Sequence, residues 1–388
     1  FGIRNSDITQ IKNNVQLKNV NVQGHYDNQH SELLLHNLSA MLEAKPLTGN
    51  LQLKHLQAPE FIGNLKAELN LENLQNFMQL DTIKTLNGQM KLDVQFSGQL
   101  SAGTKSKIKN LATSGSMSIS DMNLLIKGSN NAFSNMNGNF EFNNNNVQIN
   151  NLTGNFAHTD FDFKGSFLNA IAFLFKENED VTVEATLNAK NIDLNEMLTN
   201  KGGSGQNYAL QFSEHINLNL NSNIEHLVFR CFEATDIYGN IRLNNKKLYA
   251  DPLTLSTMDG IITTSGIVDG TDTARLIVTC YSEMEKINIT KLFSEFENFG
   301  ETEITDKNLK GTLAAKVNFA AELSPTLKID ADKLYAAVDM TVENGEMNNV
   351  EAMKSLSKYI ALEELQNIRF ATLKNQIEIK KQLITIPK

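Results

Sequence analysis

An alternation of apolar and polar residues with a period of two constrains this chain more than any other feature. In the stretch LNGQMKLDVQFSGQL, from Leu86 to Leu100, apolar side chains occupy every second position between Met90 and Phe96. Such a strand has one apolar face and one polar face, as in antiparallel sheets that are wetted on one side. The alternation recurs along the chain, so we expect a mostly β protein.

A similar strand sequence recurs downstream. LKGTLAAKVNFAAEL, from Leu309 to Leu323, aligns with the first stretch without a gap and shares Leu, Gly, Val, Phe and Leu at the same positions. A third, looser copy is INLNLNSNI, from Ile216 to Ile224. Repetition of this kind predicts stacked copies of one strand-rich unit.

Short helical segments precede these three strands. Each segment begins with an apolar residue, an Asn or Asp, and a second apolar residue, followed by a short amphipathic turn. Asn70, Asp193 and Asn288 are the predicted caps, because a short side-chain oxygen can accept a hydrogen bond from a free backbone N–H at a helix start. The three segments are LNLENLQNFM (Leu69 to Met78), IDLNEML (Ile192 to Leu198) and INITKLF (Ile287 to Phe293).

These patterns predict three units of roughly 100 residues each. The predicted units are 63–190, 191–286 and 287–388, after an N-terminal β segment, 1–62, that continues from a missing upstream part. The last unit ends differently, because apolar residues from Val350 to Phe370 are spaced at helical intervals before strand patterns return. We expect a C-terminal amphipathic helix there, followed by cap strands.

Asn is unusually frequent, and we expect it mainly in turns between short strands. Pairs of Asn or Asp with Gly, and runs of Asn, recur about every ten residues. The predicted turns lie at Gly63 and Asn64, Asn87 and Gly88, Asn137 and Gly138, Asn143 to Asn146, Gly239 and Asn240, Asn244 and Asn245, Asp259 and Gly260, Asp269 and Gly270, and Asn344 and Gly345.

Composition excludes some classes of protein. The formal net charge of -9 argues against a nucleic-acid binder, which needs a basic face. Cys231 and Cys280 are the only cysteines, too few for a disulfide scaffold, and whether they pair stays open. Both lie in runs that resemble strands. No apolar run approaches the ~18 residues of a membrane span.

Candidate catalytic or metal-binding residues are sparse, and we predict neither an enzyme nor a cofactor. HYDNQH, with His25, Asp27 and His30, could place two imidazoles and a carboxylate together, but a solvated loop is the better interpretation. KGGSGQN, from Lys201 to Asn207, matches no phosphate-binding spacing and predicts a flexible linker. Further polar candidates are expected in solvated strand positions: His158, His215, His226, Asp160 and Asp162.

The repeated apolar face is the remaining candidate site. A second sheet could close it into a sandwich or solenoid core, or the sheet could curl into an open gutter whose floor binds a ligand. Composition alone does not separate these two interpretations, and on the strand pattern we place the closed core ahead. The candidate floor residues are Met90, Leu92, Val94, Phe96, Phe140, Phe142, Phe161, Phe163, Leu218, Leu220, Val317 and Phe319.

Several segments resemble those of the AsmA-like family of diderm bacteria, the relatives of TamB, particularly the Asn- and Lys-rich versions of Bacteroidota-type genomes. The similarity covers most of the chain from about Gly63 onward, and the end resembles an AsmA-like C-terminal region. The segments are the strand openings LNGQMKLDVQFSG and LKGTLAAKVNF, the strands SGSMSISDMNLLIKG and AAVDMTVENGEMNN, and the closing SLSKYIALEELQNIRFATLKNQIEIKKQLITIP.

The resemblance implies an elongated, curled antiparallel sheet, called a repeating β-groove, around an apolar channel. It also implies a periplasmic location, with an N-terminal helix in the inner membrane that this sequence lacks, so we expect a fragment. The implied function is phospholipid movement between the inner and outer membranes and outer-membrane lipid homeostasis. The implied partners are phospholipid acyl chains, both membranes and other envelope proteins, but no nucleic acid. The alternative is a β scaffold that assists outer-membrane protein assembly by strand addition.

Overall fold

The structure is a computed structural model, which describes residues 1–10, 15–42, 44–56, 58–73, 83–100, 108–127, 131–157, 159–175, 178–199, 210–350 and 366–386. The chain divides into two compact units. Unit 1 comprises Phe1–Thr186 and His215–Asn217, and unit 2 comprises Leu187–Glu214 and Leu218–Lys388. The predicted division into three units is a different partition of the chain and stays a prediction.

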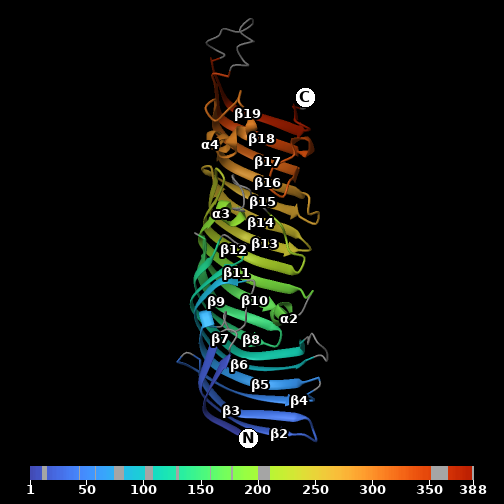
Figure 1. Cartoon of the computed structure of the whole chain (residues 1–388). Coiled ribbons are helices and arrows are strands. Elements are labelled where there is room, and N and C mark those ends of the chain that lie inside the picture. Colours follow the sequence, from blue (N-terminus) through green and yellow to red (C-terminus); the bar gives the residue numbers. More distant parts are fainter. Residues whose placement is uncertain are drawn as a thin grey trace. The chain divides into compact units, whose positions relative to one another are not determined.

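Unit 1 is an antiparallel meander, in which consecutive strands lie side by side (Figure 1). Helix α2 (Ala170–Phe175), which the sequence patterns did not predict, follows the tenth strand. The strands are β1 (Gly2–Gln10), β2 (Val15–Asp27), β3 (Glu32–Leu42), β4 (Lys45–Lys54), β5 (Glu60–Asn70), β6 (Ile83–Leu100), β7 (Ile108–Ile126), β8 (Phe133–Asn143), β9 (Asn146–Phe156), β10 (Thr159–Leu168) and the first part of β11 (Val181–Asp193).

Unit 2 repeats the meander from β12 onward. Its helices are α3 (Leu194–Leu198), α4 (Ile289–Glu295), and the 3₁₀ turns η1 (Glu297–Gly300) and η2 (Ala331–Lys333). Its strands are β12 (Ile216–Phe229), β13 (Phe232–Asn244), β14 (Lys247–Thr257), β15 (Gly260–Asp269), β16 (Leu276–Asn288), β17 (Leu309–Leu323), β18 (Tyr335–Asn348), β19 (Asn367–Lys380) and β20 (Leu383–Thr385).

The predicted fold class is confirmed, since each unit is a curled, unclosed antiparallel sheet with few short helices. The three copies of the repeated strand became β6, β17 and the first part of β12. Most of the predicted C-terminal helix, 351–365, lies outside the described residues. Its last predicted turn, Asn367 to Phe370, is instead the start of strand β19.

The caps of two predicted helices are confirmed. The Asp193 carboxylate accepts hydrogen bonds from the backbone N–H of Asn195 (2.8 Å) and Glu196 (3.3 Å) at the start of α3. Asn288 accepts one from Lys291 at the start of α4. The prediction for Asn70 is wrong among the described residues, because its buried side-chain oxygen accepts no hydrogen bond there. Leu71 to Asn73 are helical, and 74–82, the remainder of that segment, lie outside the described residues.

Five of the nine predicted turns are wrong, because the chain continues through them as strand. The pairs beginning at Gly63, Asn87, Asn137, Gly239 and Asn344 lie inside β5, β6, β8, β13 and β18. At the four pairs other than that at Gly63 the register with a neighbouring strand shifts, which marks β-bulges that bend long strands without ending them. The other four predicted turns lie where strands end, as in β8 to β9, β13 to β14, β14 to β15 and β15 to β16.

One buried cluster of unit 2 lies where β16 leads into α4. Ile287 has no solvent exposure and clusters with Ile289 and Leu292 of the helix and with Leu313 and Val342 of the sheet. The helix therefore covers one end of the apolar face of the sheet. In unit 1, Leu42, Ala67 and Leu69 form a smaller buried cluster at the end of β5.

Candidate functional site

The strand register of unit 1 brings the predicted floor residues of β6 and β8 onto one face. Leu92 pairs with Met117 of β7, which pairs in turn with Phe140. Val94 and Phe142 are connected in the same way through Gly115. Because directly paired residues project from the same side of a sheet, these side chains form continuous rows across three strands.

The two phenylalanines of β10 extend this face. Phe163 pairs with Leu152 of β9, which pairs with Gly138 of β8, two residues from Phe140. Phe161 pairs with Gly154. All eight predicted floor residues of unit 1 therefore lie on one apolar face, which we call face A1 and which also includes Leu35, Leu51, Leu65, Met117, Ile119, Ile149 and Leu152.

Unit 2 has a corresponding apolar face. Leu220 begins a row that crosses seven strands through Ile241, Ala250, Gly266, Cys280, Phe319 and Ala336. Leu218 and Val317 belong to the neighbouring rows on the same side. We call this surface face A2. It contains the four predicted floor residues of unit 2.

Both faces stay accessible in their middle. Eleven of the twelve predicted floor residues are half-buried, and only Leu220, which is 8% exposed, belongs to the buried class. None of the twelve is exposed. Intermediate burial is what an unclosed, curled sheet gives to apolar side chains, whereas a second sheet packed across the face would bury them. Among the described residues the open gutter fits better than the closed core, which the sequence analysis placed ahead.

Aromatic rings cover glycines across the strands of face A1. Phe96 lies over Gly63, so a Cβ added at that glycine would be 2.8 Å from the tip of the ring. Phe61 covers Gly98 in the same way, and its ring centroid is 6.1 Å from that of Phe96. The rings therefore lie along the sheet rather than projecting from it, and they give the face a continuous aromatic lining.

Face A2 carries hydroxyl groups that the sequence patterns missed. Ser222, Thr264 and Ser282 occupy inward positions of an otherwise apolar row that continues through Val317. The Thr264 and Ser282 hydroxyls are hydrogen-bonded at 2.8 Å, while the buried Ser222 hydroxyl has no partner among the described residues. The sequence did carry a signal for these hydroxyl groups. All three residues occupy positions at which the alternation of apolar and polar residues predicts an apolar side chain.

The opposite faces of both sheets are polar. Cross-strand ion pairs join Lys66 to Asp93 (3.2 Å) and Lys91 to Glu68 (3.3 Å) in unit 1. In unit 2, Lys316 pairs with Glu283 at 3.4 Å. A hydrogen bond from the Tyr281 hydroxyl, and after it the pairing with Lys316, lower the pKa of Glu283. The two sides of each sheet thus differ in chemistry, as the alternation predicted.

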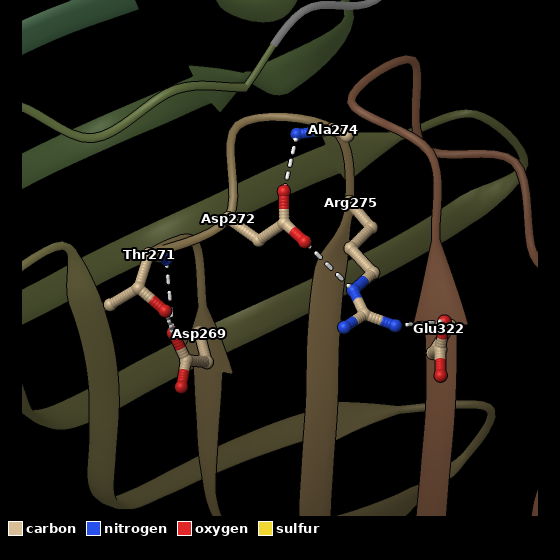
Figure 2. A network of polar contacts seen from close by, with 6 residues as sticks. All are labelled: Asp269, Thr271, Asp272, Ala274, Arg275 and Glu322. Atoms are coloured by element: carbon tan, nitrogen blue, oxygen red, sulfur yellow. Dashed lines mark hydrogen bonds and ion pairs between the residues drawn. The ribbon is translucent and has the colours of Figure 1, made fainter.

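In unit 2, a network of polar contacts lies at the strand ends opposite those next to α4 (Figure 2). The Arg275 guanidinium donates to Asp272 and to Glu322, both at 3.0 Å. Asp269 accepts hydrogen bonds from the hydroxyl and the backbone N–H of Thr271, and Lys247 lies 2.8 Å from its second oxygen. These contacts lower the pKa of Asp269 to about 2, with the Lys247 hydrogen bond as the largest cause.

The predicted solvated histidines lie mostly as expected, but the loop predicted for HYDNQH is wrong for His25 to Asp27, which belong to strand β2. His30 and Asp27 form an ion pair at 2.5 Å in the turn after β2, and their hydrogen bond raises the pKa of His30 and lowers that of Asp27. His215 lies 2.8 Å from an oxygen of Asp180, and His226 lies 4.0 Å from Glu233. His158 and the predicted linker, Lys201 to Asn207, lie outside the described residues.

Two polar positions differ from prediction. One oxygen of Asp162 is buried and has no hydrogen-bond partner among the described residues, although a solvated position was expected, while Asp160 is half-buried. Cys231 lies in the turn between β12 and β13 rather than in a strand. Both thiols are free, and partial burial on face A2 raises the pKa of Cys280. No cluster of three metal-ligating side chains occurs in the described part of the chain.

Comparison of the chain with family models, with curated proteins and with solved structures finds no match. The similarity to AsmA-like proteins therefore rests on the quoted motifs and stays a prediction. Of the helices within the described ranges, none combines the length and the apolar character needed to cross a bilayer.

Proposed function

We propose that this chain binds the acyl chains of phospholipids along faces A1 and A2 and helps move phospholipids between the inner and outer membranes. The observation that carries the proposal is the partial exposure of aligned apolar rows on unclosed sheets. A periplasmic location, attachment to the inner membrane by an N-terminal helix, and contact with envelope proteins belong to the same proposal. No catalytic step is included.

The energetics favour a continuous apolar surface for this task. Moving a two-chain lipid with about thirty methylenes into water costs on the order of 20 kcal/mol, at ~0.8 kcal/mol each. A face lined by Leu92, Val94 and Phe140 would replace much of the lost apolar contact while the head group stays in water. Aliphatic and phenylalanine side chains also tolerate acyl chains of mixed length, so we expect little selectivity for the head group.

Lipid bound to the purified chain tests the proposal. We expect phospholipid to co-purify and to be detected by mass spectrometry, and we expect the delipidated chain to take up a fluorescent phospholipid. A lipid-free chain that takes up none would contradict the proposal. Retention of an unfolded outer-membrane barrel protein in place of lipid would favour the assembly-scaffold alternative instead.

A pair of variants locates the binding to face A1. Phe96→Asp places a charge among the apolar rows, so uptake should fall while the far-UV circular dichroism spectrum is kept. Gln95→Asp is the matched control, because the neighbouring side chain points to the polar face and is exposed. Equal uptake by both variants would argue against face A1. If Phe96→Asp unfolds the chain, Phe142→Asn provides a milder polar change on the same row.

A further inference from the structure

The polar side of unit 2 contains a cavity that the lipid-binding proposal does not use. It has a volume of about 500 Å³ and lies over β13 to β18. Its lining includes the cross-strand row from Tyr249 through Ile267, Thr279 and Ala320 to Tyr335. Most lining residues alternate with those of face A2 along each strand, so the cavity opens on the opposite side of the sheet. Four others, Ala250, Gly266, Cys280 and Phe319, belong to the face A2 row itself.

Tyrosine rings surround this cavity. Tyr281 and Tyr335 are 40% and 38% exposed, while Tyr249 is half-buried beneath the guanidinium of Arg242, which lies 5.0 Å from its ring. Between Tyr249 and Tyr335 the row contains Ile267, Thr279 and Ala320, so only small side chains, Thr279 and Ala320, lie next to Tyr335. This arrangement leaves room for a flat ligand between aromatic surfaces.

The charges at the cavity cancel. Arg242 and Asp251, the charged residues of the lining, pair with each other at 2.6 Å. Beside the cavity, the Tyr281 hydroxyl donates to Glu283 at 2.6 Å, and Glu283 pairs with Lys316. A phosphate or carboxylate would therefore have to compete for cations that are already paired, and one paired carboxylate is too little for a metal ion.

Neutral hydrogen-bonding groups complete the lining. Ser265, Thr279 and Asn318 provide hydroxyl and amide groups that both donate and accept hydrogen bonds. The volume falls in the ~300–1,000 Å³ range of small-molecule sites. Exposed aromatic rings beside neutral polar groups suit a ligand with apolar C–H faces and hydroxyl edges, which is the surface of a pyranose sugar.

We propose that this cavity binds a neutral oligosaccharide, with a pyranose ring stacked on Tyr281 or Tyr335 and its hydroxyls hydrogen-bonded to Asn318 and Thr279. The site is open and shallow, so the affinity should be weak, with a Kd of about 0.1–1 mM. The proposal is independent of lipid binding, because the two surfaces lie on opposite sides of the same strands.

The test uses the full chain and three uncharged probes: maltotriose, cellotriose and the trimer of N-acetylglucosamine. We expect at least one to give a saturable signal in saturation-transfer-difference NMR and in calorimetry. Tyr281→Ala and Tyr335→Ala should each weaken binding at least about tenfold. Tyr281→Phe, which keeps the ring and loses only the hydrogen bond to Glu283, should bind within about threefold of the parent chain.

Tyr238→Ala is the matched control, because Tyr238 is 55% exposed on the same polar side of β13 but does not line the cavity. It should leave sugar binding unchanged, and lipid uptake should be the same in all four variants. Failure of all three sugars to bind would overturn the proposal. So would binding that is insensitive to Tyr281→Ala and Tyr335→Ala, or binding that Tyr238→Ala weakens as much.

Discussion

At the strand ends of unit 2, Asp269 and Lys247 interact through charge and hydrogen bonds rather than through burial. The Asp269 carboxylate is 23% exposed and its partner, the Lys247 ammonium, is 38% exposed, so solvent screens their attraction. The pKa of Asp269 nevertheless falls from its ordinary value of 3.8 to about 2, since Lys247 and two groups of Thr271 all favour the charged form.

Replacing Asp269 by Asn tests this contribution. A lowered pKa in the folded state stabilises the fold above pH ~4, and the stabilisation is lost as the pH falls towards 2. Asp269→Asn should therefore lower the free energy of unfolding by about 0.5–1 kcal/mol at pH 7, after allowance for screening. The difference from the parent chain should shrink steadily between pH 4 and pH 2.5, as measured by urea unfolding.

Lys247→Gln completes a double-mutant cycle for this pair. In the Lys247→Gln background, Asp269→Asn should lower the free energy of unfolding by less than in the parent chain, because the largest cause of the lowered pKa of Asp269 is already absent. An equal cost in both backgrounds, or a difference that does not change with pH, would show that the pair does not set the pKa of Asp269.

At the level of strands, glycine and phenylalanine act as partners. Gly63 of β5 lies beneath the ring of Phe96, and a side chain there would also meet the backbone oxygen of Asn50 at 2.8 Å. β-propensity alone predicts that a larger residue in mid-strand stabilises a sheet. Here the cross-strand neighbours reverse that expectation, because the backbone oxygen cannot move away as a side chain can.

Gly63→Ala should therefore destabilise the chain by about 1–3 kcal/mol, the usual cost of overpacking. Gly2→Ala in β1 is the matched control. An added Cβ there meets only the oxygen of Val22 at 3.6 Å, so its cost should stay within ~0.5 kcal/mol. Denaturant midpoints of the two variants measure the difference, and equal midpoints would contradict the proposed Gly–Phe packing.

The conformation of Asn and Asp residues inside strands explains why local sequence patterns predicted turns where strands continue. Asn37, Asn135 and Asp121 adopt positive φ angles of 50° to 55° inside strands. The backbone N–H of each donates to an Asn side-chain oxygen on a neighbouring strand, as from Asn37 to Asn50 at 3.0 Å. Asn tolerates this left-handed conformation both in a turn and at a bulge. Only the partner strand, distant in sequence, decides between the two.

For the whole chain, the period-two alternation predicted the fold class and placed all twelve floor residues on apolar faces within their own units. It could do so because successive side chains of a strand point to opposite faces, so every second residue lies on the same face. The tyrosine cavity was not predictable in this way. Its rings come from β14, β16 and β18, and their meeting depends on a register that local patterns do not encode.

Two separate apolar faces imply more than one lipid site on each chain, if acyl chains bind as proposed. Titration of the delipidated chain with a fluorescent phospholipid should then saturate above one lipid per chain. Phe96→Asp in face A1 and Val317→Asp in face A2 should each lower the saturating ratio without abolishing binding, because each charge removes sites from one unit only.

The double variant decides between this arrangement and a single site. It should lose nearly all binding, with the two single effects adding, since the altered residues belong to different units. If either single variant abolished binding altogether, the two faces would have to act as one surface. If both left the saturating ratio unchanged, acyl chains would bind elsewhere and the functional role of both faces would be refuted.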